Sequence, residues 1–519
     1  MSPTVTEFLL ARADDERCGL RFENRSWSWR EVVRTCAQHA SLLRSLRRPG
    51  PFHIGVLLGN VPEFTFLLGG TAFSGAVLVG LNPTRRGEAL ARDVRLTDCQ
   101  LVVTDTAHAH LLPNTGVPVL LVDSAPWSAL LAEHDGAELD PAAADPDDLL
   151  VLVFTSGTGG DPKAVRCTHG KIAFPGRMLA ERFGLTGEDV IYVAMPLFHS
   201  NALMAGWAVG AAAGGTIALR RRFSASGFLP DVRRFGATYA NYVGKPLAHV
   251  LATPERPDDA DNPLRLVYGN EANERDVRRF AERFGCRVVD AFGSTEGGIA
   301  IPRSPDTPPG ALGRLPDGVA VLDPDTGKPC ATARFSPDGQ LLNPDEAIGE
   351  LVNTAGSGWF AGYYNAPAAD AERMRDGMYW SGDLAYVDAA GFCRFAGRTA
   401  DWLRVDGENL ATAPIERILL RHPEVREAAV YAVPDPTTGD QVVAALVTTD
   451  GFRAETVADF LAAQSDLGPK QWPRYLRLTP DLPRTATHKV LKRHLMTEAL
   501  DTQDPVYRRE GSRYLRELG

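Results

Sequence analysis

Cysteine is scarce in this chain, and its spacing excludes two classes of small stabilised domain. The 519-residue sequence has seven scattered cysteines, and no two of them form a C-x-x-C pair. An odd set of dispersed cysteines does not fit a disulfide framework, and structural zinc sites need closely spaced ligand pairs. We therefore expect reduced thiols and a cytoplasmic protein.

Long apolar runs are also missing. No segment reaches the roughly 18 apolar residues of a membrane span, and the nearest candidate, Phe64 to Leu81, is interrupted by four glycines. That segment predicts a packed helix, a turn and a strand. The first twelve residues lack the basic and apolar parts of a signal peptide. Neither an amphipathic basic helix nor a lipidation motif is evident, so membrane association is not evident from the sequence and stays open.

A concentrated basic block is the third absence. The net charge is −10, and short runs such as residues 220–222 stand alone in an acidic background. Nucleic acids need a basic surface, so we expect no nucleic-acid partner.

Hydrophobic patterning predicts an α/β protein with more than one domain. A chain of 519 residues is too long for a single core. In the first 300 residues, short apolar runs alternate with helical patterns, which is typical of parallel sheets covered by helices on both faces. A β-rich texture follows Pro305, and strand–helix alternation resumes near Arg398. We predict a large domain, residues 1–398, with parallel-rich αβαβα sheets and a β-barrel-like region, and a small α+β domain, residues 399–519.

The most informative segment is a small loop that follows an apolar run at residues 149–154. The run predicts a buried strand. The loop is rich in glycine and hydroxyl groups and contains Thr155, Ser156, Gly157, Thr158, Gly159, Gly160 and Lys163. Glycines let the backbone approach a ligand, and N–H groups, hydroxyls and a lysine suit a polyphosphate. The Walker spacing is absent. An ordinary turn is the alternative interpretation.

A second segment places a hydroxyl and a carboxylate after another predicted strand. Residues 288–292 form a partly apolar run, and the glycine turn that follows contains Thr295 and Glu296. This pattern predicts a Mg²⁺ or phosphate site at a strand end, the usual ligand position in open α/β sheets. A strand with a capped turn is the alternative.

Three later segments fit the same chemistry in the same order. Asp383 lies on a predicted turn, where its carboxylate suits two ribose hydroxyls, and Arg398 is placed to assist it. The next of these three segments begins at Arg404. The last is a near-terminal loop with Lys489, whose charge suits a phosphate in a transition state. Taken singly, each of these segments also fits a solvated turn.

Together the five ordered motifs, which lie between Asn60 and about Arg493, resemble the adenylate-forming superfamily of acyl-CoA synthetases, peptide-synthetase adenylation domains and luciferases. Within it, the chain is similar to the fatty-acid-transport-protein-like, very-long-chain acyl-CoA synthetases. The closer resemblance rests on Tyr268-Gly269-Asn270, on residues 407–412, and on His488 where most of the superfamily has glycine.

The resemblance implies a role for each motif. The loop from Thr155 to Lys163 would hold the β- and γ-phosphates of ATP. Thr295 would contact the α-phosphate, Glu296 would hold Mg²⁺, and Phe292 would stack on adenine. Asp383 and Arg398 would bind the ribose, and further nucleotide contacts would come from Asn270, Gly293 and Arg404. The acyl pocket would include Asn241, Lys245, Tyr268, Gly269 and Gly298.

The same resemblance implies an ATP-dependent acid:CoA ligase with a mobile carboxy-terminal domain. Lys489 would bridge the substrate carboxylate and the α-phosphate while acyl-AMP forms and pyrophosphate leaves. Rotation of the small domain would then remove the lysine and admit the CoA thiol. His199 matches the family's histidine beside the acyl channel, although the residues alone also fit a buried structural histidine.

Three positions depart from the superfamily pattern. Gly159 replaces a threonine and so removes one hydroxyl donor, a loss of about 1 kcal/mol. Ala400 stands where a hinge usually has Asp or Lys. Residues 241–245 match an acyl-pocket helix that usually ends in glutamate, so Lys245 reverses a charge. This lysine is either a surface ion-pair partner or a contact for an anionic group of the substrate.

Other functions remain open at this point. A relative of this kind can pass the acyl group to a carrier protein or an amine, or can activate nitrite for diazotisation of an aromatic amine. An Arg- and Ala-rich, Lys-poor composition indicates a GC-rich genome and fits such a biosynthetic role. A non-catalytic nucleotide binder is the remaining alternative, and the set Lys163, Glu296, Asp383 and Lys489 argues against it. The family contains monomers and homodimers.

Overall fold

The computed structural model describes most of the chain. It leaves out residues 1, 86, 156–161, 273, 338, 340, 399–401, 406–407, 436–438, 465–466, 468–470, 485–489, 512 and 518–519, and at 398, 402–405, 408–411, 435, 439–440 and 493 it describes the backbone alone. The chain divides into two compact units. One contains Asp161–Gly297, Trp359–Ala371 and most of the chain before them, and the other contains Gly298–Gly358 and Glu372–Gly519. The predicted boundary between residues 398 and 399 stays a prediction.

The first unit contains a six-stranded sheet with the strand order β6-β5-β3-β4-β7-β8. Its strands are β3 (His53–Leu57), β4 (Val77–Gly80), β5 (Cys99–Thr104), β6 (Val119–Leu121), β7 (Leu149–Thr155) and β8 (Lys163–Thr168). All pairs are parallel except β7 with β8, which form an antiparallel hairpin. The predicted buried strand before the phosphate loop is therefore confirmed as β7.

A seven-stranded sheet in the same unit has the order β13-β12-β11-β9-β10-β1-β2. Its strands are β1 (Cys18–Phe22), β2 (Arg25–Ser28), β9 (Val190–Val193), β10 (Thr216–Leu219), β11 (Tyr239–Val243), β12 (Leu266–Asn270) and β13 (Arg287–Asp290). Only β1 and β2 pair antiparallel. Parallel strands end at one edge of a sheet, so the loops after β9, β11, β12 and β13 gather there.

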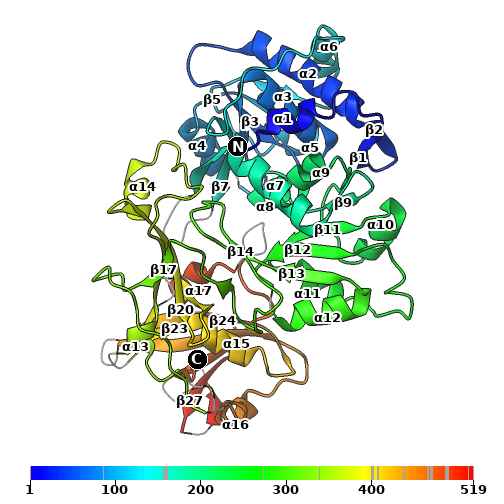
Figure 1. The fold of residues 1–519 in the computed structure, drawn as a ribbon. Helices are drawn as coiled ribbons and strands as arrows, with labels where there is room; N and C mark the ends of the chain where they lie inside the picture. The colour runs from blue at the N-terminus through cyan, green and yellow to red at the C-terminus, as the bar shows by residue number, and fades with distance from the viewer. Residues whose placement is uncertain are drawn as a thin grey trace. The chain divides into compact units, whose positions relative to one another are not determined.

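Helices pack against both sheets (Figure 1). They are α1 (Val5–Leu10), α2 (Trp29–Leu46), α3 (Pro62–Ser74), α4 (Gly87–Leu96), α5 (Thr106–Ala109), α6 (Ala125–Ala132), α7 (His169–Phe183), α8 (Ser200–Ala202), the π-helix η1 (Leu203–Trp207), α9 (Ala208–Ala213), α10 (Phe228–Phe235), α11 (Pro246–Leu251) and α12 (Glu274–Phe284). The predicted helix, turn and strand at Phe64 to Leu81 are confirmed as α3, a left-handed Gly75 and β4. A Cβ on Gly69 would lie 2.2 Å from the Cys36 sulfur, so α3 packs tightly on α2.

The chain after Gly298 is rich in short strands. It contains β15 (Ala300–Ile301), β16 (Gly313–Arg314), β17 (Val319–Leu322), α13 (Pro344–Ala347), β18 (Gly349–Asn353), α14 (Pro367–Arg373), β19 (Met374–Arg375), β20 (Met378–Val387) and β21 (Phe392–Arg398), and β14 (Phe292–Gly293) precedes them. A sheet with the order β16-β21-β20-β18-β17 is antiparallel throughout. This sheet confirms the predicted β-rich region.

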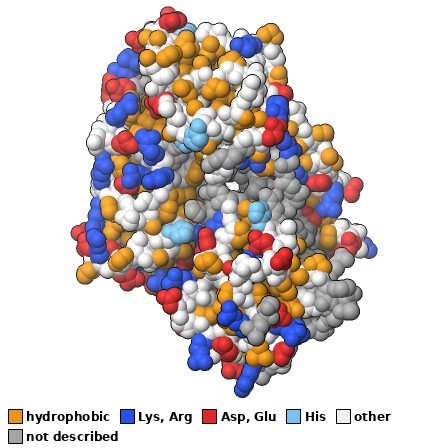
Figure 2. Space-filling view, turned by 180° about the vertical axis from the view of Figure 1, so that it is seen from behind, with side chains coloured by type: hydrophobic (Ala, Val, Ile, Leu, Met, Phe, Trp, Pro, Cys, Tyr) orange, Lys and Arg blue, Asp and Glu red, His pale blue; other side chains and the backbone are white. Residues whose placement is uncertain are grey.

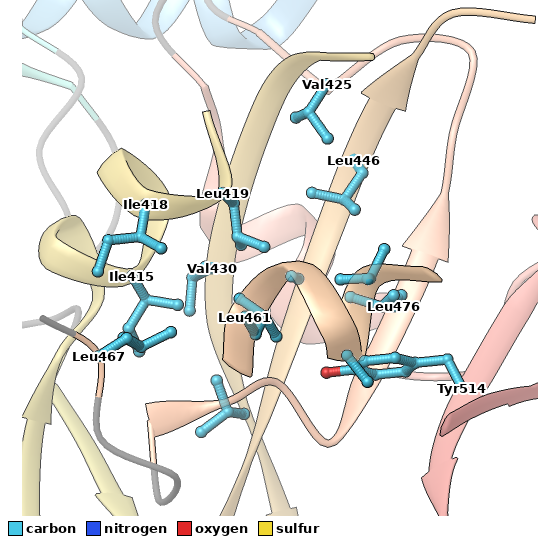
Figure 3. Close-up of a cluster of buried hydrophobic side chains, with 14 of the residues drawn as sticks. Ile415, Ile418, Leu419, Val425, Val430, Leu446, Leu461, Leu467, Leu476 and Tyr514 are labelled. Carbon is cyan, nitrogen blue, oxygen red and sulfur yellow. The ribbon is translucent and has the colours of Figure 1, made fainter. Parts of the chain in front are cut away.

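The last part of the chain forms its own sheet, with the order β23-β22-β25-β26-β27-β28 and with β24 paired to β25. Its elements are β22 (Trp402–Val405), β23 (Glu408–Ala411), α15 (Thr412–Leu419), β24 (Val425–Asp435), β25 (Gly439–Thr448), η3 (Ala454–Thr456), α16 (Val457–Ala462), β26 (Tyr475–Leu478), α17 (Lys492–Glu498), β27 (Val506–Glu510) and β28 (Arg513–Arg516). Apolar side chains from α15, α16 and the strands point toward one another in Figure 3 and form a separate core, which includes Ile415, Val430, Leu461 and Leu476.

One face of the surface and the lengths of the helices can be compared with the charge and hydropathy patterns of the sequence. On the face in Figure 2, basic and acidic side chains are interspersed and do not separate by sign. Among the described residues, none of the helices combines the length and apolar character that crossing a bilayer requires.

Candidate functional site

The predicted phosphate loop connects the two strands of a hairpin. Thr155 ends β7, Lys163 begins β8, and the two residues are paired in the ladder. Ser156, Gly157, Thr158, Gly159 and Gly160 lie outside the described residues. The hairpin therefore brings the first hydroxyl and the lysine of the motif to one end of the sheet, and the role of the loop stays a prediction.

Glu296 lies beside this hairpin. Its Oε1 accepts a hydrogen bond from the Thr155 hydroxyl at 3.3 Å and another from the Tyr363 hydroxyl at 3.2 Å. The Tyr363 ring also faces the Lys163 ammonium, which lies 5.3 Å from the ring centroid. Tyr363 thus joins two predicted site residues. Sequence reasoning missed it, because Tyr363 is 67 positions from Glu296 and no predicted motif includes it.

The donor set fits Mg²⁺ that is shared with a nucleotide. Mg²⁺ is usually held in such sites by one or two carboxylates together with substrate phosphates and water. Glu296 provides one carboxylate, oriented by two hydroxyls. Within the described part of the chain, no cluster of three or more His, Cys, Asp or Glu side chains forms a ready-made metal cage.

A buried lysine supports the same region and was also missed. Lys171, in the first turn of α7, is 3% exposed, and its Nζ donates to the carbonyl oxygens of Arg166 and Glu296 at 3.1 Å and 2.8 Å. Burial lowers the pKa of Lys171, while the nearby charges of Cys167 and Glu296 act in the opposite direction. No sequence pattern indicated that this lysine is buried.

Thr295 and His199 lie on facing loops. The Thr295 hydroxyl lies 2.6 Å from the hydroxyl of Ser200, the first residue of α8. His199 is the N-cap of α8, and its buried Nε2 has no hydrogen-bond partner among the described residues. Burial lowers the pKa of His199 to about 4, so the ring is neutral near pH 7. Its place in an acyl channel stays a prediction.

Asn60 holds the loop that carries His199. Its side-chain amide donates to the carbonyls of Met195 and Arg220 at 2.9 Å and 3.1 Å, and its Oδ1 accepts from the Leu197 N–H at 2.9 Å. The residue is 2% exposed. Two of these bonds fix the loop between β9 and α8, and the third ties it to the end of β10.

The predicted acyl-pocket helix at residues 241–245 is wrong. Residues Tyr239–Val243 form β11, and only Pro246 begins a helix, with Lys245 as its N-cap. Aromatic and β-branched side chains favour a strand, the left-handed Gly244 ends it, and proline suits the first turn of a helix. The Asn241 amide donates to the Asn201 side chain at 2.7 Å, and the place of Asn241 in an acyl pocket stays a prediction.

Three predicted residues, Tyr268, Gly269 and Asn270, lie at the end of β12. A Cβ on Gly269 would lie 2.2 Å from the Tyr242 carbonyl oxygen, so only glycine allows β11 and β12 to come this close. Asn270 donates to the Ala291 carbonyl at 2.6 Å and so ties the end of β12 to the chain after β13. Burial raises the pKa of Tyr268, which keeps the phenol neutral.

The remaining predicted residues before the small domain are placed as follows. Phe292 and Gly293 form β14, where Phe292 is half-buried and Gly293 is exposed. Lys245 is half-buried. In the second unit, a Cβ on Gly298 would lie 2.2 Å from the Tyr379 ring, so that glycine is required by packing.

Asp383 lies within a strand, and the predicted turn is wrong. It belongs to β20 and is paired in register with Arg398 of β21. The left-handed Gly382 bends the strand just before it, because the buried Glu350 accepts a hydrogen bond from the Gly382 N–H at 2.6 Å. Arg375 in turn donates to Glu350 at 3.0 Å. The ladder therefore brings the two predicted ribose residues together, and Glu350 is a support that the motif did not reveal.

The residues on either side of the predicted Lys489 segment are paired with each other. Arg484 and Val490 form an antiparallel bridge, and the Leu491 N–H donates to the Pro483 carbonyl at 2.7 Å. Lys492 then binds Thr412 and Glu416 of α15 at 2.8 Å and 2.9 Å. Lys489 lies outside the described residues, as does the side chain of Arg404, so their roles stay predictions.

Comparison with known sequences decides the family. The AMP-binding enzyme family matches residues 10–364, and the AMP-binding enzyme C-terminal domain matches residues 414–489. The chain belongs to the AMP-binding enzyme family. This result confirms the adenylate-forming superfamily and an AMP-forming ligase that uses ATP and CoA. The narrower fatty-acid-transport-protein-like branch stays a prediction.

Relatives within the AMP-binding family are similar over nearly their whole length. A medium/long-chain-fatty-acid–CoA ligase of Mycobacterium marinum is 56% identical, covering 97% of this chain and 98% of its own. A steroid-22-oyl-CoA synthetase of Rhodococcus jostii is 49% identical, covering 97% of this chain and 93% of its own. The solved structure of ATP-bound MatB from Rhodopseudomonas palustris is 24% identical, with a TM-score of 0.82 over 95% of this chain and 99% of its own. That likeness confirms the predicted α/β fold with its β-rich region and smaller carboxy-terminal domain.

Proposed function

We propose that this chain is an ATP- and Mg²⁺-dependent ligase that joins an apolar carboxylic acid, either a medium- or long-chain fatty acid or a steroid side-chain acid, to CoA. The family supports the acid and CoA as substrates. The two relatives at 56% and 49% identity, one named for fatty acids and the other for a steroid acid, support the apolar substrate class.

One observation carries the assignment to this region of the molecule. The carboxylate of Glu296 is held by Thr155, the first hydroxyl of the phosphate loop, and by Tyr363, which also faces Lys163. An acidic group fixed beside a phosphate-binding hairpin is the arrangement that a metal–triphosphate complex needs. Bound Mg²⁺ would neutralise phosphate charge there.

The chain's own residues act by positioning and charge. Lys163 and the loop hold the β- and γ-phosphates, Thr295 orients the α-phosphate, and Asp383 with Arg398 holds the ribose. A carboxylate oxygen of the acid attacks the α-phosphorus, the bond to the bridging oxygen breaks, and pyrophosphate leaves while Lys489 neutralises the developing charge. In the second step the CoA thiolate attacks the acyl carbon, and AMP leaves.

The second step supports a division into residues 1–398 and a mobile lid, 399–519. Lys489 must leave before a thiol can reach the acyl-AMP, and rotation about the segment near Ala400 would accomplish this. We further propose a cytoplasmic location, where ATP and CoA are available, and either a monomer or a homodimer.

Pyrophosphate release with a panel of acids tests this proposal. The panel contains fatty acids of increasing length, steroid side-chain acids, aromatic acids and nitrite, each with and without CoA. Release that depends on a fatty or steroid acid and rises with CoA is the expected result. Release with nitrite, or release indifferent to CoA, would replace the CoA ligase by an adenylating enzyme with another acceptor.

A further inference from the structure

Lys171 lies outside every predicted motif, and burying its ammonium group costs free energy. Lys171 is 3% exposed and lies in the first turn of the 15-residue helix α7. Burying an ammonium group is unfavourable unless partners compensate for it. The first turn of a helix also disfavours positive charge, because the helix dipole is positive there. Packing alone does not explain a lysine at this position.

The partners of Lys171 connect two parts of the proposed ATP site. Its Nζ donates to the carbonyl of Arg166, which lies on the strand that begins with Lys163, and to the carbonyl of Glu296. Both acceptors are neutral, and within the described residues the ammonium makes no ion pair. Lys171 therefore ties the phosphate hairpin to the backbone of the proposed metal ligand.

The chain after Glu296 is shaped around the same lysine. Gly297 has a left-handed φ of 73°, and a Cβ there would lie 3.1 Å from Cε of Lys171 and 3.1 Å from Cβ of Trp359. The Trp359 N–H donates to the Gly297 carbonyl at 3.0 Å. Two consecutive backbone carbonyls are thus held, that of Glu296 by the ammonium and that of Gly297 by the tryptophan N–H.

We propose that Lys171 is a positioning residue for Glu296, which it holds in place for a Mg²⁺–nucleoside triphosphate. It acts through the Glu296 carbonyl and does not touch the reacting atoms. The inference rests on the proposed function, in which Glu296 binds the metal.

The test measures ATP binding by titration calorimetry on the full chain, with and without Mg²⁺. The quantity of interest is the ratio of the ATP affinity with Mg²⁺ to the ATP affinity without Mg²⁺. Lys171→Met keeps the length of the side chain but removes its donors, and we expect the ratio to fall about tenfold, as for other supports of metal ligands. In Lys171→Gln, which retains a hydrogen-bond donor, the ratio should fall less. Lys328→Met, which removes an exposed lysine from a turn of the second unit, should leave the ratio unchanged.

A double-mutant cycle separates positioning from general destabilisation. In a Glu296→Gln background, Lys171→Met should lower the ratio no further, because both changes act through the same carboxylate. Thermal unfolding without ligand confirms that each variant is folded, and Lys171→Gln replaces Lys171→Met if the latter is not. An unchanged ratio in Lys171→Met, or additive effects in the cycle, would overturn the inference. If Mg²⁺ did not affect ATP binding by the unaltered chain, the proposed metal role of Glu296 would fail first, and this inference with it.

Discussion

Tyr363 contacts two predicted ATP-site residues. Its hydroxyl donates a hydrogen bond to Glu296, and its ring faces the Lys163 ammonium. Tyr363→Phe removes the hydroxyl and keeps the ring. A hydrogen bond to a charged group is worth about 1.5–3 kcal/mol, so kcat/KM for Mg-ATP should fall about tenfold or more. The adjacent Tyr364→Phe is a matched control, because its hydroxyl donates to Asp98 instead. Equal effects of the two changes would contradict this role of Tyr363.

In the proposed mechanism, Lys489 acts in the first half-reaction and not in the second. Lys489→Ala should reduce acyl-AMP formation by about 10²-fold or more, the usual cost of losing one group that stabilises transition-state charge. Thioester formation from supplied acyl-AMP and CoA should persist, because the lysine is not needed there. Comparing pyrophosphate exchange with thioester formation measures both steps. Loss of both to the same extent would show that the change damages the small domain.

Lys245 is the residue where the family's charge is reversed. If it meets an anionic group of the substrate, Lys245→Glu will raise KM for acids with a second negative group and shift the preference toward acids without one. Steady-state KM values for matched mono- and dicarboxylic acids measure this. Unchanged preference would leave the lysine as a surface ion-pair partner.

At the scale of elements, α7 and α9 pack closely where Gly176 meets Ala208. A Cβ on Gly176 of α7 would lie 2.6 Å from the carbonyl carbon and oxygen of Ala208, the first residue of α9. Gly176→Ala should therefore lower the free energy of unfolding by about 1–3 kcal/mol, the usual cost of overpacking. Chemical denaturation measures it. Gly59→Ala, whose Cβ would have no neighbour closer than 3.9 Å, should cost much less, and an equal cost would count against the argument.

At the scale of the whole molecule, buried neutral histidines set the response to acid. Burial lowers the pKa of His39 and His169 to about 4, against about 6.5 in an unfolded chain. Between these values the unfolded state binds more protons, so the free energy of unfolding decreases as the pH falls from about 6.5 toward 4. Each histidine contributes about 2 kcal/mol to the loss between pH 7 and pH 5. Urea denaturation at the two pH values should show a smaller loss in His39→Gln, and an identical loss would contradict the assignment.

The class of fold and the order of the motifs could be predicted from the amino-acid sequence alone. Apolar runs predicted strands such as β4 and β7, because buried parallel strands need continuous apolar side chains. The residue types at Thr155, Lys163 and Glu296 indicated a nucleotide site, because polyphosphate and Mg²⁺ require hydroxyl, ammonium and carboxylate groups.

Only the tertiary structure decided which supports hold those groups. Tyr363, Lys171, Asn60 and Glu350 each make at least one hydrogen bond to a residue far away in the sequence, and that bond depends on how strands and helices meet. The two local errors have the same origin. Residues 239–243 form a strand because they pair with β12, and Asp383 lies in a strand because β20 pairs with β18 and β21. Pairing between distant segments is a long-range interaction, and a local pattern cannot report it.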